Sequence, residues 1–267
     1  MRDGRTGVMR WQDGTWQHVA PAPAPQEMPV AIVIDGMSQA VLMATPHDLR
    51  DFALGFALTE GLIAAPEDIE GFEEAEVEAG GFAAREARLW LRPGLAAGLA
   101  ERRRSMVGPV GCGLCGVDSI AAALPQVVAV ASEWTMPPAD VGRAMAALAA
   151  GQHLRRDTPA IHGAAFWDGG AALVREDVGR HNALDKLAGA LSAQGRDAGQ
   201  GAIVMSSRLS VDLVQKCARI GAPVLIGASA PTGLALQWAA RAGITLIARA
   251  RGDSFDLYTH PRRIAGT

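Results

Sequence analysis

Hydrophobic residues in the first part of the chain form short runs, and their spacing predicts a small β-structure followed by a helix. Two β-like runs, residues 30–36 (VAIVIDG) and 40–44 (AVLMA), predict a hairpin or a small sheet that turns at Gly36. Apolar residues at helical spacing then predict an amphipathic helix that ends near Gly61. Residues 87–93 (ARLWLRP) have the composition of a further strand.

The expected start of this helix has its own sequence signal. Thr45 is the predicted N-cap, Pro46 suits the first helical position, and Asp48 completes a weak capping box. After the helix, residues 67–78 are acidic and show little periodicity. These elements belong to an N-terminal α+β part of the chain.

From residue 127 onward, runs with strand spacing alternate with runs with helix spacing. Strands are predicted at residues 127–132, 171–176, 202–207, 223–229 and 244–250, and helices at residues 138–150, 182–191, 211–220 and 231–242. Ser210 and Gly221 are the expected start and end signals of the helix at residues 211–220, and Gly243 ends the helix at residues 231–242. This alternation predicts a mainly parallel or mixed sheet between helix layers, with active groups on loops at strand ends. We divide the chain into an N-terminal α+β part, residues 1–110, and an α/β domain, residues 111–267, that starts with a Cys-x-x-Cys loop.

Composition and charge narrow the classes of partner. The 267 residues are 49% apolar, which is enough to bury a substantial core, and the formal net charge is −3. A slightly acidic chain has no general attraction for nucleic acid or acidic membranes, so neither is an expected partner. The sequence has no run of about 18 apolar residues and no signal-peptide core, and this predicts a cytoplasmic protein.

Two of the three cysteines, Cys112 and Cys115, lie in a glycine-framed loop, residues 111–116 (GCGLCG). Three cysteines do not make a disulfide framework, and a structural zinc needs about four ligands, so no structural metal is expected. A predicted helix follows at residues 117–124 (VDSIAAAL), and its N-terminus would favour a thiolate. A sulfur-carrying or reactive pair, a dithiol exchanger and a buried structural pair are the alternatives. Cys217, inside an amphipathic helix, is expected in the core.

An unusually polar stretch, residues 175–186 (REDVGRHNALDK), joins a predicted strand to a predicted helix. Asn182 as an N-cap and Gly179 as a turn residue account for two of its positions. Arg180 and His181 are candidates for binding an anion or transferring a proton. The stretch therefore carries more polar functionality than a helix cap requires.

Other candidates lie on loops farther along the chain. His162 is on a loop, where a ligand role and a structural role are about equally expected. The strand-to-helix junctions that start at residues 206 and 228 offer hydroxyl and backbone N–H groups, which suit a phosphate. Arg249 and Arg251 share one face of a predicted strand, where they can clamp a phosphate or line a sheet edge.

Zinc-dependent deamination is disfavoured by the spacing of the metal-ligand types. That chemistry uses a His-x-Glu sequence followed by Pro-Cys-x-x-Cys. No histidine of this chain has a glutamate two residues later, and Gly111 rather than proline precedes Cys112.

Five stretches together resemble the formate dehydrogenase accessory sulfurtransferase family, FdhD: GCGLCG, EDVGRHNALDK, SSRLSVDLVQK, SAPTGLAL and LYTHPRRI. The likeness covers most of the chain, including residues 45–63, and EDVGRHNALDK is its most specific part. The resemblance implies an α/β fold: a three-layer α/β/α sandwich with a mixed sheet, similar to cytidine deaminases but without their zinc. A smaller N-terminal β-containing part and a homodimer are also implied.

The function implied by the resemblance is that of a sulfur carrier, a sulfurtransferase with a persulfide intermediate. Such a protein receives sulfane sulfur from a cysteine desulfurase. It passes the sulfur to a bound acceptor, the molybdenum or tungsten bis-guanine-dinucleotide cofactor. The molybdenum form is molybdenum bis(molybdopterin guanine dinucleotide). Formate dehydrogenase requires this step for activity, so its apoenzyme is an implied partner.

The resemblance also assigns residues. Cys112 is the implied persulfide-bearing residue, and Cys115 assists transfer. The expected cofactor-binding set joins the family's C-terminal stretch to the candidates above: Ile247, Ala248, Arg249, Ala250, Arg251, Gly252, Ser206, Ser207, Arg208, His162, Arg180 and His181. Where the family commonly has GGTHxAA, this chain has TPAIHGAA, with Pro159 and Ala160 before a retained His162. A non-catalytic molybdenum-cofactor chaperone and a dithiol oxidoreductase remain alternatives.

Overall fold

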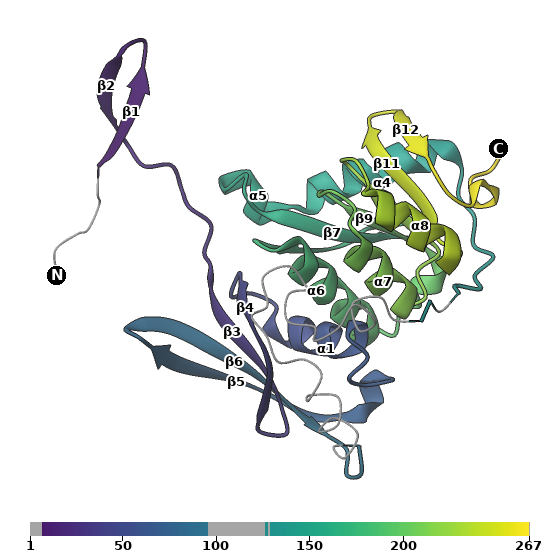
Figure 1. Cartoon of the computed structure of the whole chain (residues 1–267), viewed down its shortest axis with the longest axis horizontal. Helices are drawn as coiled ribbons and strands as arrows, with labels where there is room; N and C mark the ends of the chain where they lie inside the picture. Colours follow the sequence, from purple (N-terminus) through teal and green to yellow (C-terminus); the bar gives the residue numbers. More distant parts are fainter. Residues whose placement is uncertain (1–6, 96–125, 128, 267) are drawn as a thin grey trace.

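The computed structural model describes residues 7–95, 126–127 and 129–266. Their strands form three sheets, and helices pack against two of these sheets (Figure 1). The strands are β1 (Val8–Gln12), β2 (Thr15–Val19), β3 (Met28–Ile34), β4 (Met37–Ala44), β5 (Ile69–Ala79), β6 (Phe82–Leu91), β7 (His162–Trp167), β8 (Leu173–Asp177), β9 (Ala202–Met205), β10 (Val224–Gly227), β11 (Thr245–Arg251) and β12 (Ser254–Leu257). The α-helices are α1 (Leu49–Thr59), α4 (Pro138–Gly151), α5 (His153–Asp157), α6 (Arg180–Ala193), α7 (Val211–Arg219) and α8 (Gly233–Ala242).

The larger unit is built on a six-stranded mixed sheet with the order β12-β11-β10-β9-β7-β8. The central strands β9, β10 and β11 are parallel, whereas β7, β8 and β12 pair with their neighbours in antiparallel fashion. Strands β9 and β10 are buried along their whole length, which is typical of a sheet covered on both faces.

Helices cover both faces of this sheet and form the outer layers of the predicted three-layer α/β/α sandwich. Residues of α6, α7 and α8 pack in one apolar cluster with alternate residues of the sheet. Residues of α4 pack in a second cluster against the opposite face. Figure 1 shows α6, α7 and α8 on the near side of the sheet and α4 behind it. The expected fold class is therefore confirmed.

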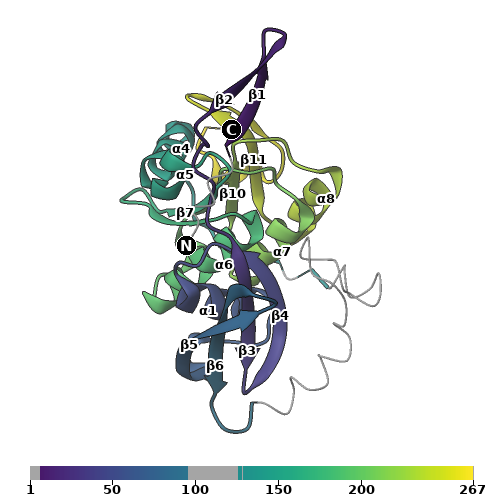
Figure 2. The same cartoon turned by 90° about the vertical axis from the view of Figure 1, so that its left-hand side faces the viewer.

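The smaller unit is a four-stranded sheet with the order β4-β3-β6-β5, and α1 packs against one of its faces. The other side of α1 packs against α6, so α1 lies between the two units (Figure 2). Two glycines let these helices approach closely: a Cβ at Gly55 would overlap the Asp185 carbonyl oxygen, and one at Gly189 would overlap that of Asp51. The predicted hairpin at residues 30–44 is thus part of a larger sheet.

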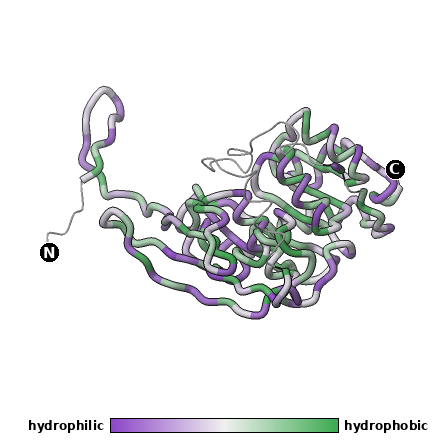
Figure 3. Tube along the Cα trace, turned by 60° about the horizontal axis from the view of Figure 1, so that its bottom comes forward, coloured by the Kyte–Doolittle hydropathy of each residue, from purple (hydrophilic) through white to green (hydrophobic). Residues whose placement is uncertain are grey.

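Strands β1 and β2 form a hairpin that stands away from both units (Figure 1). Nine of their ten residues are exposed, including Trp11 and Trp16, whose rings lie 5.2 Å apart. In Figure 3 hydrophobic and hydrophilic stretches alternate along the trace of both units. No helix of the described residues is long and apolar enough to cross a membrane.

Several local predictions are wrong, each for a physical reason. Thr45 is not the N-cap of α1, because Asp48 occupies that position and Thr45 forms hydrogen bonds with Asp177, the last residue of β8, and with Val178. Asn182 is not the N-cap of α6, which begins two residues earlier after Gly179. The described residues among 127–132 form no strand, and the acidic residues that lacked periodicity form β5.

The predicted boundary between residues 110 and 111 lies outside the described residues and stays a prediction. The strands expected near residues 87–93, 171–176, 202–207, 223–229 and 244–250 are confirmed within a few residues, as are the helices expected near residues 138–150, 182–191, 211–220 and 231–242.

Candidate functional site

The connectivity of the six-stranded sheet brings the candidate residues of distant segments to one edge. Strands β9 and β10 end at this edge, at Met205 and Gly227. Because β7 is antiparallel to β9, its first residue, His162, lies at the same edge. The two strands are joined there by hydrogen bonds between Gly163 and Ser206: the Gly163 N–H donates to Ser206 Oγ at 2.8 Å, and the Ser206 N–H donates to the Gly163 carbonyl at 3.0 Å. We call this edge of the six-stranded sheet, where β9 and β10 end, the carboxyl edge.

Three helices begin at the carboxyl edge, because each follows a strand that ends there. Helix α6 follows β8, whose last residue Asp177 pairs with His162, and α7 and α8 follow β9 and β10. Thr232 caps α8 by accepting a 3.2 Å hydrogen bond from the Ala235 N–H. The free N–H groups and positive dipole ends of the three helices favour an anionic ligand.

Buried polar atoms without a partner lie at this edge. Among the described residues, they include His162 Nδ1, Arg180 Nε and Ser210 Oγ. Buried polar groups in folded proteins are almost always hydrogen-bonded, so such a group of atoms indicates a ligand-binding site. Burial, and next the charge of Arg180, lower the pKa of His162 and keep its imidazole neutral at neutral pH.

His181, on the first turn of α6, faces the carboxylate of Asp212 on the first turn of α7. His181 Nε2 contacts Asp212 Oδ2, and both side chains are largely buried. Burial lowers the pKa of His181 to about 4, although the Asp212 charge acts in the opposite direction. At neutral pH the ring is therefore a neutral imidazole beside a carboxylate.

The junction between β9 and α7 has both buried and exposed side chains. Ser207 is buried, and its hydroxyl donates to the Arg208 carbonyl at 3.0 Å, so it is already used in the loop. The Arg208 side chain is exposed beyond it. Ser210 occupies the predicted cap position of α7, but its hydroxyl makes no capping hydrogen bond.

The C-terminal stretch predicted to bind the cofactor divides between core and surface. Ile247, Ala248 and Ala250 are at most 1% exposed and belong to the core, so their side chains cannot reach a ligand. Arg249 and Arg251 are exposed, as strand alternation predicted. A ligand can meet this stretch only through the arginines and the backbone.

Arg249 lies at a β-bulge in the left-handed conformation, with φ of 51°. Its Nε is 2.8 Å from Asp256 Oδ2, and its Nη2 donates to Tyr258 Oη at 2.7 Å. Gly252 lies beside Gly142 of α4, on the face of the sheet opposite α6. The structure therefore gathers His162, Arg180 and His181, whereas Gly252 faces another helix layer.

The rest of the polar stretch 175–186 joins parts of the fold. The Glu176 carboxylate accepts hydrogen bonds from the backbone N–H groups of Leu154 and Arg155, at 2.7 and 3.0 Å, at the start of α5. Asp177 and Lys186 form a fully buried ion pair of 2.7 Å. The two candidates of this stretch, Arg180 and His181, lie at the start of α6 and therefore at the carboxyl edge.

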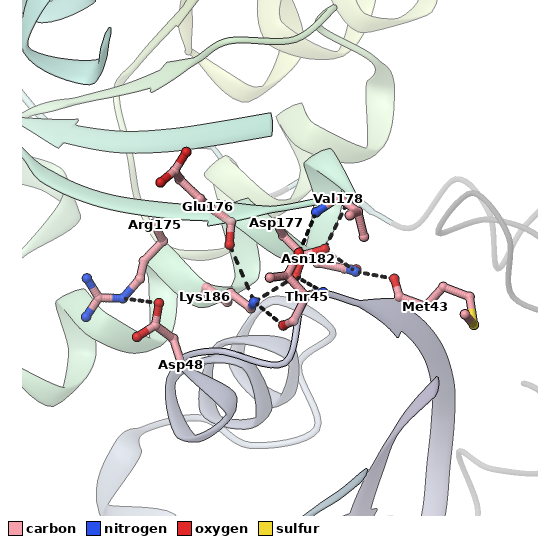
Figure 4. Close-up of polar contacts among 10 residues, drawn as sticks. Met43, Thr45, Asp48, Arg175, Glu176, Asp177, Val178, Asn182 and Lys186 are labelled. Carbon is pink, nitrogen blue, oxygen red and sulfur yellow. Dashed lines mark hydrogen bonds and ion pairs between the residues drawn. The ribbon is translucent and has the colours of Figure 1, made fainter. Parts of the chain in front are cut away.

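Asp177, Asn182 and Lys186 fasten the segment after β4 to the larger unit (Figure 4). Lys186 Nζ donates to the Thr45 carbonyl at 2.8 Å, and the Thr45 N–H donates to Asp177 Oδ2 at 3.0 Å. The Asn182 amide donates to the Met43 carbonyl and to Asp177 Oδ1, both at 2.9 Å. The segment that contains Thr45 is thus held by polar contacts and does not cap a helix.

Cys112 and Cys115 lie outside the described residues, so their roles stay predictions. Asp212 was not identified from the sequence, although an acidic residue at the second position of a helix is a recognisable signal at such a junction. Within the described ranges, no cluster of three or more His, Cys, Asp or Glu side chains is arranged to hold a metal ion.

Comparison with known proteins identifies the family. The model of the FdhD/NarQ family matches residues 25–265, so the chain belongs to this family. Curated relatives named "Sulfur carrier protein FdhD" include one from Agrobacterium fabrum, 47% identical over 90% of this chain and 88% of its own length. Another, from Bordetella bronchiseptica, is 43% identical over 98% of this chain and 92% of its own.

A solved structure has the same architecture. It is the crystal structure of a protein from Desulfotalea psychrophila that is described as a formate dehydrogenase accessory protein. The two chains superpose with a TM-score of 0.70 at 25% identity, over 97% of each chain. The fold described above is therefore the fold of an experimentally determined relative.

Proposed function

We propose that the protein is a cytoplasmic sulfur carrier that serves formate dehydrogenase. Cys112 accepts sulfane sulfur from a cysteine desulfurase as a persulfide, with Cys115 assisting. The terminal sulfur then passes to the molybdenum or tungsten bis-guanine-dinucleotide cofactor, which is the substrate that accepts it. The sulfur-carrier names of relatives that are 42–47% identical over most of the chain support this role.

The formation of the persulfide is a thiol exchange. The Cys112 thiolate attacks the terminal sulfur of the donor's persulfide, a new S–S bond forms, and the donor's cysteine thiolate leaves. Glycines 111, 113 and 116 flank the two cysteines in the sequence, and glycine has no side chain that could block a donor.

The observation that carries the acceptor half of the proposal is the group of buried, unpartnered polar atoms at the carboxyl edge: His162 Nδ1, Arg180 Nε and Ser210 Oγ. Three helix N-termini surround them and supply partial positive charge. A dinucleotide offers phosphate oxygens to the N–H groups and other polar groups to the imidazole and hydroxyl. We therefore place the guanine dinucleotide at this edge, with Arg208, Arg249 and Arg251 at its rim, in a homodimer whose second copy holds an equivalent site.

A persulfide assay tests the sulfur half. The chain is incubated with a cysteine desulfurase and cysteine, and cyanolysable sulfur and intact mass are measured for the wild type, Cys112→Ala and Cys115→Ala. We expect a one-sulfur adduct that is lost in Cys112→Ala. Full loading of Cys112→Ala would contradict the assignment, and formate dehydrogenase maturation by a variant without either cysteine would favour the chaperone alternative.

Binding of guanosine diphosphate tests the acceptor half. We expect Arg180→Gln to weaken binding at least tenfold, because a charged hydrogen bond to phosphate contributes about 1.5–3 kcal/mol. Arg143→Gln, which removes an exposed arginine of α4, is the matched control. Equal affinities of the two variants would count against this location.

A further inference from the structure

Helices α6 and α7 face each other through two polar pairs that are one helical turn apart. The first pair is His181 with Asp212, at the carboxyl edge. The second is Asp185 with Lys216, four residues later on each helix, with Lys216 Nζ 2.9 and 3.1 Å from the two carboxylate oxygens. Both helices start at the same edge and run in the same direction, so the two pairs form a ladder of two rungs.

The second rung holds the two helices at a fixed spacing. Thr59 Oγ1, at the end of α1, donates to Asp185 Oδ1 at 2.6 Å, and Lys216 Nζ is 2.7 Å from Glu60 Oε1. Asp185 and Lys216 are nearly inaccessible to solvent. A buried and multiply bonded rung has little freedom, so it also fixes the position of Asp212 relative to His181.

The first rung determines which nitrogen of His181 carries the proton. An ionised carboxylate only accepts hydrogen bonds, so Nε2, which contacts it, must be the protonated nitrogen. Nδ1 is then left with a lone pair. A neutral imidazole in this state is a hydrogen-bond acceptor at Nδ1.

Charged groups on α6, on α7 and at the end of α1 act on this imidazole. Arg180 on α6 and Lys216 on α7 disfavour a second proton, whereas Asp212 on α7 and Glu60 after α1 favour one. The two cations and two anions oppose each other, so the burial of the ring decides the outcome. His181 therefore stays neutral, next to an arginine that can only donate.

We propose that Asp212 is a positioning residue that holds His181 as its Nε2–H tautomer, so that Nδ1 accepts a hydrogen bond from an N–H or O–H group of a bound nucleotide. The inference rests on the proposed function, which places a guanine nucleotide at this edge. Arg180 and the helix N-termini contact phosphate oxygens, and His181 contacts the nucleoside. The site thus distinguishes a nucleotide from a simple phosphate anion through one hydrogen-bond acceptor, His181 Nδ1.

Asp212→Asn tests the positioning role directly. An amide can donate to Nε2, which allows the tautomer with the proton on Nδ1. Histidine ¹⁵N chemical shifts and long-range ¹H–¹⁵N couplings identify the tautomer, with His181→Phe used to assign the signal among the six histidines. We expect Nε2–H in the wild type and Nδ1–H in Asp212→Asn. A wild-type ring protonated at Nδ1 would overturn the inference.

Two probes then separate the nucleoside contact from the phosphate contacts. We expect Asp212→Asn and His181→Phe to bind guanosine diphosphate at least tenfold more weakly than the wild type, and pyrophosphate with unchanged or higher affinity, since Asp212→Asn removes a negative charge. Asp140→Asn, which removes an acid from the first turn of α4, is the control and should alter neither affinity.

The outcomes distinguish this inference from the proposed function. Wild-type affinity for guanosine diphosphate in Asp212→Asn overturns the positioning role while leaving the proposed function intact. An equal loss of affinity for both probes also overturns it, because it indicates general damage to the site. A wild-type protein that binds neither probe contradicts the acceptor half of the proposed function itself, and the tautomer measurement still reports on Asp212.

Discussion

His181 illustrates how one side chain links burial to pH dependence. In the unfolded chain its imidazole takes up a proton near pH 6.5, whereas in the folded chain it does so only near pH 4. Between these values the unfolded state binds more protons, so the folded state loses stability as the pH falls. Arg180 and Lys216 add to the effect of burial, and Asp212 and Glu60 oppose it.

We therefore expect the free energy of unfolding to fall by about 3 kcal/mol from this one group between pH 6.5 and pH 4. His181→Gln, which has no titrating ring, should show a correspondingly flatter pH dependence. Urea denaturation of both proteins at half-unit pH steps provides the measurement. Parallel pH profiles would show that the folded ring titrates as an ordinary histidine.

At the scale of elements, the α1–α6 crossing depends on two residues without side chains. Gly55 and Gly189 each place a Cα against a backbone carbonyl of the other helix. An added methyl group has no space there, and the helices can accept it only by moving apart.

Gly55→Ala and Gly189→Ala should each lower the free energy of unfolding by about 1–3 kcal/mol, despite the better helix propensity of alanine. Gly233→Ala is the matched control: it is also a helical glycine with φ outside the left-handed region, and a Cβ there meets nothing within 4 Å. Chemical denaturation of the three variants compares them. Equal stability of all three would mean that the crossing tolerates a wider spacing.

The elements themselves were largely predictable from the sequence, and their exceptions have a common cause. The helices at residues 138–150 and 231–242 follow from local periodicity and end signals such as Gly243. The roles of Thr45 and Asn182 did not follow, because each bonds to a residue more than 130 positions away. Local capping rules contain no information about such contacts.

The same limit applies to the candidate site. Arg180, His181 and His162 could be chosen by residue type and loop position, and the structure places all three at one edge. The role of Asp212 depends on the packing of α7 beside α6. The spacing of residues in the sequence does not predict this packing. Ile247 and Ala248 belong to the predicted cofactor-binding stretch, residues 247–252. Their side chains are buried, whereas those of Arg249 and Arg251 are exposed.

At the scale of the whole molecule, the two units are joined by buried polar contacts as well as by the apolar faces of α1. Lys186 is the centre of one such set, with the Asp177 carboxylate at 2.7 Å and the Thr45 carbonyl at 2.8 Å. Removal of one partner of a buried ion pair leaves the other charge without compensation, which costs far more than the loss of a surface pair.

Lys186→Met should therefore lower the free energy of unfolding by about 3–5 kcal/mol. Arg143→Met, which breaks an exposed ion pair on α4, should cost at most about 1 kcal/mol and serves as the control. Denaturation followed by tryptophan fluorescence and by circular dichroism measures both. A cost for Lys186→Met as small as that of the control would mean that water reaches Asp177.

The chain has only two lysines, and its other permanently charged basic side chains are arginines. Lys186 and Lys216 are 0% and 5% exposed, and their ammonium groups lie 5.7 and 5.6 Å from the ring centres of Phe52 and Phe56 on α1. Enzymes and reagents that acylate lysine side chains thus find no accessible target on the folded protein. Lysine acylation would occur only in molecules whose α1–α6–α7 junction has opened, and its rate measures how often that happens.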